Sequence, residues 1–582
     1  MLPLLLLLVP LCYAAIYDRV ADLPTLDFDY IIVGGGTAGN VLANHLTEDP
    51  DITVLVLEAG NSTADVLLSQ VPFFCTLATP NTPLDWNFTT VPQPGLNGRV
   101  IPIPRGFGLG GSSAVNYMAY TRGSSEDYDR YASVGGDSGW RWDEIQPYFR
   151  KNERFVAPTD HHNTTGEFNP SVHGFRGINS VTLPGYPRAI DSHILQATKE
   201  LPDSFPFNLD FNSGYQLGIG WEQTTVGNGT RSSSQTSYLG PNYIDRKNLH
   251  VLVYSYVTRI LIANTSHSSL PRFDAIEFTQ DAGVTIKTLS PPNLKEIILS
   301  AGTIGTPHIL LNSGIGDAGE LSALDITPTV DLPDVGRNLT DHPRWSLVWN
   351  VNDTSTTEAY WRNDTFQADA LAEWSANRTG YIFSTVWNHI GFSRIGEDLF
   401  KEEPCAGNLT AHYELVFASG IFESTIPATG NYLTTTVILL CPLSRGSITI
   451  NSTNPLDPPL LNPNFLSHPQ DIVTMQYAVE GAQKFVLAPV WKDYVLALTT
   501  NITDLEENIR NEAGSTDHQV STASMSPVGA GWGVVDPDLR LKRAMGVRVV
   551  DASVLPFIPA AHTQATVYAF AERAADLIKG RK

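Results

Sequence analysis

Residues 27–46 read DFDYIIVGGGTAGNVLANHL and carry the strongest structural signal in the chain. An apolar, β-branched run leads into a glycine triplet, and apolar residues then recur with helical spacing. This pattern predicts a buried strand, a tight turn and a helix. The spacing Gly34-x-Gly36-x-x-Gly39 lets bare backbone approach a diphosphate at the positive end of that helix. The stretch therefore indicates a dinucleotide-binding turn.

A second apolar strand supports this interpretation. Residues 53–57 read TVLVL and are followed by Glu58. This carboxylate comes about 20 residues after the last glycine, where it accepts a hydrogen bond from a ribose hydroxyl in dinucleotide-binding folds. The alternative is an ordinary glycine-rich strand-to-helix turn. The two strands together with Glu58 favour nucleotide binding.

Length and charge restrict the class of protein. With 582 residues, of which 42% are hydrophobic, the chain can bury a large core, and we expect two intimately connected domains. The formal net charge of −23 argues against nucleic acid or an anionic membrane as a partner, because both attract basic surfaces. We therefore interpret the excess of acidic residues as a feature that keeps the protein soluble.

The first fifteen residues resemble a secretory signal. Residues 1–15 contain the apolar run LLLLLV and end in small residues, although no Lys or Arg precedes the run. About a dozen Asn-x-Ser/Thr sequons fit an exported glycoprotein. Cleavage would leave Cys75, Cys405 and Cys441, and three thiols predict neither a disulfide framework nor a metal site. No other span is long and apolar enough to anchor the chain in a membrane.

A second glycine-rich segment follows at residues 104–118, PRGFGLGGSSAVNYM. Paired glycines and short hydroxyl side chains allow close contact with a planar, polar ligand, so we expect a second cofactor-contact loop. Residues 249–253 and 256–261 read as strands of a smaller sheet. Residues 295–302 repeat the pattern of a strand that runs into small residues, and a helix is expected to follow over residues 304–311.

These motifs resemble those of the glucose-methanol-choline (GMC) flavoprotein oxidoreductases. Residues 110–116 are similar to the first family signature, residues 302–316 to the second, and residues 334–342 to the segment that follows. The resemblance covers nearly the whole mature chain. The subgroup that it resembles most is the fungal aryl-alcohol oxidases, from residues 58–60 through residues 532–539.

The resemblance implies an α/β fold, with a Rossmann-like FAD-binding domain and a discontinuous substrate domain built on an antiparallel sheet. Residues 26–341 would be mainly FAD-binding and residues 342–515 mainly substrate-binding. Residues 516–582 would form the catalytic loop and return to the FAD domain. The motifs and the resemblance together assign these cofactor contacts: Gly34, Gly36, Thr37, Ala38, Gly39, Glu58, Arg105, Gly111, Ser112, Asn116, Val257, Asp551 and Thr563.

The resemblance also bears on how the flavin is held. Some family members tether it through a histidine at the position that is Val115 here. A valine side chain cannot form that bond. We therefore expect non-covalent FAD.

Two histidines near the C-terminus are the candidate catalytic residues. Oxidising an alcohol by hydride transfer requires a base for the hydroxyl proton and donors for the oxygen, and imidazole can serve both purposes near neutral pH. By resemblance, His518 is the base, and His562 binds the substrate oxygen and helps protonate reduced oxygen. Tyr117 and Phe422 resemble a pocket tyrosine and a lid-loop aromatic residue of aryl-alcohol oxidases. The alternative is that both are ordinary core aromatics.

Four residues depart from the family pattern. Gln519 replaces a proline and Ser521 a glycine, which removes one rigid and one permissive backbone angle. Asp517 stands where the most similar subgroup has an aromatic residue, and Ala560 where it has asparagine. A carboxylate beside His518 would favour the protonated ring if the side chains meet. As the pH is lowered, turnover is therefore expected to fall sooner than it would with an aromatic residue at this position.

The sequence thus predicts a secreted FAD-dependent oxidoreductase. It would oxidise primary, aryl or allylic alcohols to aldehydes and reduce oxygen to hydrogen peroxide, with no metal, nucleic acid or membrane involved. Two alternatives remain. One is a sugar (pyranose) dehydrogenase that uses quinone acceptors, and the other is a flavin-binding protein with impaired catalysis.

Overall fold

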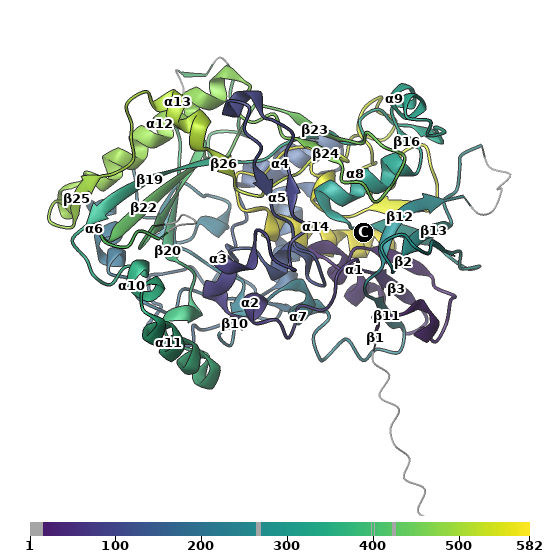
Figure 1. Ribbon diagram of the computed structural model, residues 1–582, viewed down its shortest axis with the longest axis horizontal. Helices are drawn as coiled ribbons and strands as arrows, with labels where there is room; N and C mark the ends of the chain where they lie inside the picture. Colours follow the sequence, from purple (N-terminus) through teal and green to yellow (C-terminus); the bar gives the residue numbers. More distant parts are fainter. Residues whose placement is uncertain (1–14, 263–268, 397–398, 401, 422–425, 582) are drawn as a thin grey trace, which may run out of the picture.

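The computed structural model describes residues 15–262, 269–396, 399–400, 402–421 and 426–581. Two large sheets, one parallel and one antiparallel, lie in different halves of the molecule (Figure 1). No helix among the described residues combines the length and apolar character needed to cross a membrane.

The parallel sheet contains the strand predicted from the glycine motif. Its order is β1-β11-β3-β2-β15-β27, and every neighbouring pair runs parallel. The strands are β1 (Ile16–Tyr17), β2 (Tyr30–Val33), β3 (Val54–Leu57), β11 (Leu249–Leu252), β15 (Glu296–Leu299) and β27 (Val547–Val549). All residues of β2 and β3 are buried, as expected for central strands covered on both faces.

Helices pack around this sheet. The helix after the glycine turn is α1 (Thr37–Leu46), which packs against α14 (Thr563–Ile578), and α14 in turn packs against α5 (Trp142–Asn152). The last long helix of the chain therefore returns to the nucleotide-binding half. Helix α8 (Gly302–Asn312) follows β15, close to the predicted limits of 304–311.

One strand prediction was wrong. We predicted that residues 249–253 belong to a smaller sheet, but β11 pairs with β3 and β1 in the main parallel sheet. All four of its residues are buried, which suits a strand with neighbours on both edges. The smaller sheet instead joins β12 (Tyr256–Leu261), β13 (Ala275–Thr279) and β14 (Lys287–Leu289).

The second sheet has the order β25-β19-β22-β21-β20-β8, and β26 pairs with β19. Its strands are β8 (Gly218–Trp221), β19 (Pro343–Val351), β20 (Trp387–Ser393), β21 (Tyr413–Ala418), β22 (Tyr432–Leu439), β25 (Val495–Leu498) and β26 (Gly514–Ser515), all paired antiparallel. These two sheets confirm the predicted α/β fold with a second, antiparallel unit.

Side chains alternate between the two faces of the antiparallel sheet, as its pleat requires. Leu415, Phe417 and Val437 share a hydrophobic core with helix α12 (Pro469–Val486). Their neighbours Val416, Thr436 and Ile438 instead line a cavity on the opposite face. One face is therefore structural, and the other forms the wall of the site described below.

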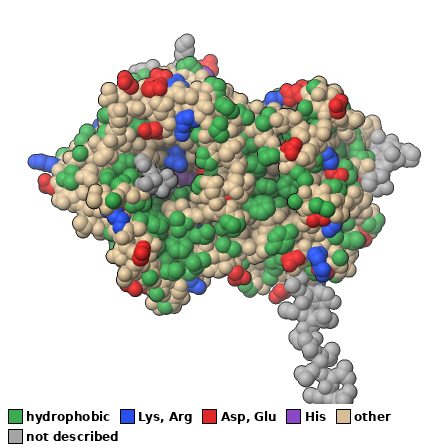
Figure 2. All heavy atoms as spheres, in the orientation of Figure 1, with side chains coloured by type: hydrophobic (Ala, Val, Ile, Leu, Met, Phe, Trp, Pro, Cys, Tyr) green, Lys and Arg blue, Asp and Glu red, His purple; other side chains and the backbone are tan. Residues whose placement is uncertain are grey.

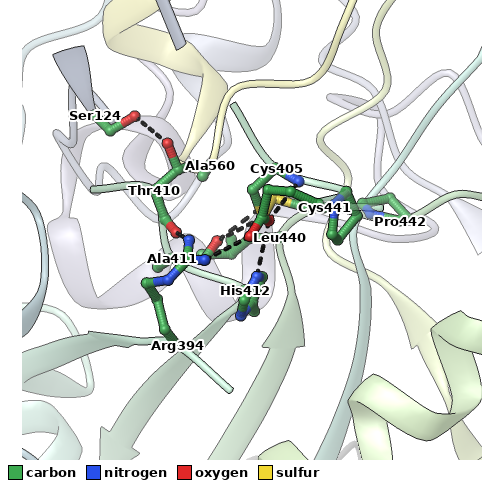
Figure 3. The surroundings of a disulfide bond; sticks show 12 residues. Ser124, Arg394, Cys405, Thr410, Ala411, His412, Leu440, Cys441, Pro442 and Ala560 are labelled. Atoms are coloured by element: carbon green, nitrogen blue, oxygen red, sulfur yellow. Dashed lines mark hydrogen bonds and ion pairs between the residues drawn. A yellow bond between two sulfur atoms is a disulfide. The ribbon is translucent and has the colours of Figure 1, made fainter. Parts of the chain in front are cut away.

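A disulfide joins Cys405 to Cys441 across 36 residues, and Cys75 is a buried free thiol (Figure 3). The count of three cysteines did not predict this bridge. Leu440 N donates to His412 O at 2.9 Å, which continues the pairing of β21 and β22, and the Sγ atoms of Cys405 and Cys441 both lie 3.4 Å from Ala411 O. Glu403, Cys405 and His412 have potential ligand atoms within 4.8 Å of one another. The Cys405 sulfur is already bonded, so it cannot bind a metal as a free thiolate.

Candidate active site

A cavity of about 580 Å³ is lined by residues from both halves of the molecule. One wall contains Val33, Leu57 and Ser300 at the carboxyl ends of the parallel strands, where α/β folds bind their ligands. The opposite wall contains Trp387 and Thr436 of the antiparallel sheet. Figure 2 shows a hollow in the face over the antiparallel half, with basic and histidine side chains visible inside it.

The glycine turn forms one end of the cavity. Gly34 has φ +101°, and a Cβ added there would lie 2.5 Å from the backbone oxygen of Ser300. A Cβ on Gly39 would lie 2.0 Å from the oxygen of Gly34. Gly39 itself does not line the cavity, so it serves the contact between helix and strand.

Helix α1 begins at this turn without a side-chain cap. Its N-cap is Gly36, and Thr37 and Ala38 of the first turn line the cavity. Uncapped N–H groups at the start of a helix are suited to bind a diphosphate. The bare turn and the open helix end therefore fit the diphosphate of FAD.

Glu58 and Asp551 hold the backbone around this end of the cavity. The Glu58 carboxylate accepts hydrogen bonds from Gly35 N and Gly60 N, both at 2.9 Å, and burial raises its pKa. Asp551 Oδ2 accepts from Gly302 N at 2.9 Å and from Thr306 Oγ1 at 2.6 Å. Both carboxylates line the cavity, and their bonds to backbone N–H groups fix the loops that shape it.

The second glycine-rich loop is tied to α14. Asn116 Nδ2 donates to Gln564 Oε1 at 2.9 Å, and Asn116 Oδ1 accepts from Arg231 Nη1 at 2.9 Å. Val115 lines the cavity near this loop. Of all the predicted site residues, the following line the same cavity: Gly34, Gly36, Thr37, Ala38, Glu58, Arg105, Gly111, Ser112, Asn116, Tyr117, Val257, His518, Asp551, His562 and Thr563. Phe422 lies outside the described residues.

The two predicted catalytic histidines meet at the cavity. His518 lies on the loop after β26, and His562 is the N-cap residue of α14. Their ring centroids are 4.7 Å apart and the rings are inclined at 77°. Residues separated by more than forty positions thus form one polar pair beside the cofactor-binding end.

Asp341 holds the catalytic loop in place. Its Oδ1 accepts from His518 N at 2.9 Å and from His342 N at 2.8 Å, while Oδ2 accepts from Gln519 Nε2 at 2.6 Å. Gln519 therefore restrains the loop with a hydrogen bond where relatives use a proline ring. Ser521 has φ +82°, so the backbone keeps the left-handed conformation that glycine favours. Both replaced positions therefore contribute to a defined loop conformation in this chain.

The condition set for Asp517, that its side chain meets the ring of His518, is not fulfilled. Its backbone oxygen accepts from Arg105 Nη2 and its Oδ1 accepts from Ser515 Oγ at 3.2 Å, whereas no hydrogen bond or ion pair joins it to His518 among the described residues. Burial lowers the pKa of His518 well below its ordinary value, and the nearby His562 and His342 lower it further. Burial also raises the pKa of Asp517 to about 7. The surroundings of His518 therefore favour the neutral ring.

His562 has a different partner. Its Nε2 lies 2.9 Å from Glu414 Oε1, and Glu414 is fully buried in β21. The backbone N of His562 donates to Thr121 Oγ1 at 2.8 Å. A buried carboxylate favours a proton on the ring nitrogen that faces it.

Several residues at the site were not predicted. Glu414 and Trp387 lie on substrate-domain strands that carry no motif, and Trp387 stacks on Tyr117 with centroids 5.4 Å apart. His342 lies within the family segment 334–342, and that resemblance was the only signal that could have identified it. Its Nδ1 is 3.0 Å from Nδ1 of His518.

A Rossmann-like glycine turn and a histidine pair in one cavity define a nucleotide-dependent oxidoreductase. Residues 28–344 match the GMC oxidoreductase N-terminal model, and residues 442–571 match the C-terminal model. The chain belongs to the GMC oxidoreductase family and acts on CH–OH groups. FAD is the typical cofactor of this family.

The relatives include both dehydrogenases and an oxidase. The chain is 43% identical to dehydrogenase eriK of Hericium erinaceus, covering 98% of this chain and 97% of the relative. It is 39% identical to pyranose dehydrogenase 3 of Leucoagaricus meleagris, covering 97% and 95%. A fungal aryl-alcohol oxidase structure matches with a TM-score of 0.81 at 27% identity, covering 95% and 99%. The higher identities favour the dehydrogenase alternative over the oxidase that we predicted.

Proposed function

We propose that the protein is an FAD-dependent dehydrogenase that oxidises a CH–OH group of a sugar and passes the electrons to a quinone. The polar wall beside His518 carries this proposal. Asp517 lines the cavity, and the adjacent Thr516 Oγ1 is enclosed without a hydrogen-bond partner among the described residues. An enclosed hydroxyl beside a carboxylate favours a ligand with several hydroxyls, because an aryl alcohol would leave the Thr516 hydroxyl unpaired.

The residues around the cavity supply the proton chemistry. His518 accepts the hydroxyl proton of the substrate, for which a neutral ring is required. His562, whose ring is oriented by Glu414, binds the substrate oxygen. FAD, when bound, supplies the acceptor for the hydride that leaves the carbon atom. The wall formed by Thr516 and Asp517 orients the remaining hydroxyls.

An aryl or allylic alcohol is the second candidate substrate, with oxygen reduced to hydrogen peroxide. The stacked pair of Tyr117 and Trp387 favours it, because both rings line the cavity and offer a flat apolar surface.

Substrate and acceptor can be tested together. We would measure kcat/KM for D-glucose and benzyl alcohol, with 1,4-benzoquinone or oxygen as acceptor, in the parent, Asp517→Asn and Asp517→Phe. We expect glucose with benzoquinone to give the highest value in the parent, and Asp517→Phe to lose glucose activity selectively. A highest value for benzyl alcohol with oxygen would replace the first candidate by the second.

We also propose that FAD is held without a covalent bond to the protein. Val115 supports this, because its aliphatic side chain lines the cavity at the position where some relatives carry a tethering histidine. Precipitation of the yellow protein in acid tests the proposal. Flavin is expected in the supernatant, and flavin retained in the pellet would contradict it.

Secretion is the third part of the proposal. It is supported by the signal-like residues 1–15 and by the disulfide, since disulfides form mainly in oxidising compartments. N-terminal sequencing of protein from the culture medium is expected to begin at Ile16. Protein found only inside the cell with Met1 retained would contradict it.

A further inference from the structure

We propose that His342 is a positioning residue that fixes which nitrogen of His518 carries the hydrogen. The structure assigns a directed chain from Leu440 O through His342 to His518, which leaves His518 Nε2 unprotonated toward the cavity. The inference deepens the proposed function, since it rests on His518 being the base. It also predicts which of the two ring nitrogens of His518 carries the hydrogen, and this can be observed without substrate.

The chain begins at a group that can only accept a hydrogen bond. His342 Nε2 lies 3.0 Å from the backbone oxygen of Leu440. A carbonyl oxygen has no hydrogen to donate, so Nε2 of His342 must carry one. Leu440 is itself fixed on both sides. Its backbone N–H donates a hydrogen bond to His412 O at 2.9 Å, and the next residue, Cys441, forms the disulfide (Figure 3).

The next step follows from the charge of His342. The ring is fully buried, and burial together with the nearby His562 lowers its pKa to about 3. Near neutral pH the His342 ring therefore carries a single N–H hydrogen. This hydrogen is on Nε2, because Nε2 donates to the Leu440 carbonyl. The Nδ1 atom of His342 is then an acceptor.

This acceptor determines the state of His518. The two Nδ1 atoms lie 3.0 Å apart, so one of them must donate, and only His518 can do so. A neutral His518 with its hydrogen on Nδ1 has an unprotonated Nε2. No hydrogen bond joins that Nε2 to any described part of the protein, and His518 lines the cavity. The free lone pair is thus directed to the place where a hydroxyl proton must be accepted.

The reverse chain is unfavourable. If His342 donated from Nδ1, its Nε2 would face the Leu440 oxygen as a second acceptor at 3.0 Å, buried and without a hydrogen between them. A His518 ring with the hydrogen on Nε2 could still donate to a substrate oxygen but could not accept its proton. In serine proteases, loss of the residue that holds the catalytic histidine in its tautomer lowers kcat by about 10⁴.

Two substitutions separate the hydrogen-bond role of His342 from packing. His342→Phe keeps a ring of similar size but removes both nitrogens. His342→Gln keeps one acceptor for His518 and one donor for Leu440. We expect His342→Phe to lower the limiting rate of anaerobic flavin reduction by about 10²-fold, and His342→Gln to retain most of the parent rate. D-glucose and benzyl alcohol serve as the reductants. If only packing mattered, the order would reverse, because Phe buries no unpaired polar group. A rate for His342→Phe at or above that of His342→Gln would overturn the proposal.

A readout without substrate keeps the test decisive if either variant fails to fold. The FAD-loaded parent would be labelled with ¹⁵N-histidine, and the His518 signals assigned by their loss in His518→Asn. We expect an acceptor-type shift for Nε2 and a donor-type shift for Nδ1. A hydrogen on Nε2 of the parent would overturn the proposal. The expected shifts combined with undiminished flavin reduction in His518→Asn would leave the chain intact and contradict the proposed base instead.

Discussion

His518 and His562 are the same kind of side chain in the same cavity, yet their surroundings are opposite. The ring of His518 ends a chain of neutral groups, His342 and the Leu440 carbonyl, and burial keeps its pKa low. The ring of His562 contacts the buried carboxylate of Glu414. Burial keeps the ring of His518 neutral, so its free nitrogen is an acceptor, whereas the ring of His562 has a carboxylate as its partner.

This difference depends on which atoms of each histidine the nearest carboxylate contacts. The only nearby carboxylate that contacts the His518 residue, Asp341, bonds to its backbone N–H and leaves the ring without a negative partner among the described residues. At His562 the carboxylate contacts the ring itself. The placement of one carboxylate therefore distinguishes the surroundings of the two rings.

Replacing His518, the proposed base, should have the largest effect on flavin reduction. We expect His518→Ala to lower the limiting rate of anaerobic flavin reduction by about 10²- to 10⁴-fold, the usual contribution of a positioned general base. FAD content should stay at the parent value. His161→Ala, an exposed loop histidine, is the matched control. Equal rates in His518→Ala and the control would show that another group accepts the proton.

Neutralising the partner of His562 should have a smaller effect. Glu414→Gln keeps an acceptor for Nε2 but removes the charge, and charge-assisted hydrogen bonds are roughly twice as strong as neutral ones. We expect about a 10-fold loss in flavin reduction. Glu403→Gln is the control. Glu403 Oε1 lies 3.0 Å from His412 Nε2, which is a similar contact, and neither residue lines the cavity. An unchanged rate in Glu414→Gln would mean that the carboxylate does not distinguish the two rings.

The disulfide should matter more for stability than for rate. Cys405→Ser/Cys441→Ser removes a bridge that closes 36 residues and is expected to lower the free energy of unfolding by about 2–4 kcal/mol. The Leu440 carbonyl keeps its hydrogen-bonded strand neighbour, so flavin reduction should fall only a few-fold. Denaturant unfolding followed by flavin fluorescence measures the first effect, with the parent protein as the reference. Equal unfolding midpoints in the double variant and the parent would contradict it.

The sequence predicted the parts of the site that depend on local patterns. The turn at Gly34 to Gly39 is specified by adjacent residues, and both histidines lie in motifs carried by the family resemblance. The supports of the histidines lie far away in sequence: His342 and Leu440 are separated by 98 positions, and Glu414 and His562 by 148. Such pairs depend on how strands align in a folded sheet, and no local pattern encodes them.

Asp517 shows the same limit for electrostatics. Its place next to His518 in sequence suggested an ion pair, but φ +63° at Asp517 and its contact with Ser515 direct the carboxylate elsewhere. Adjacent residues on a loop can point in different directions, so sequence proximity alone did not predict the sign of the pKa shift. The neutral environment of His518 became visible only in the folded protein.

The smallest expected effect is in the pH profile, and it tests that neutral environment directly. Because burial lowers the pKa of His518 well below its ordinary value, the ring should remain an unprotonated base as the pH falls through the range in which exposed histidines gain a proton. The titratable groups near the ring are Arg105, His342, His562, Asp341 and Asp517. Of these, Asp517 has a pKa of about 7, which falls inside the measured range. The limiting rate of flavin reduction is therefore best measured in Asp517→Asn at saturating substrate from about pH 5 to pH 8. We expect it to change less than about 2-fold, because no proton is gained by the base over that interval. A rate that halves near pH 6.5 or above would mean that His518 titrates like an exposed histidine, and the contrast with His562 would then have to come from Glu414 alone.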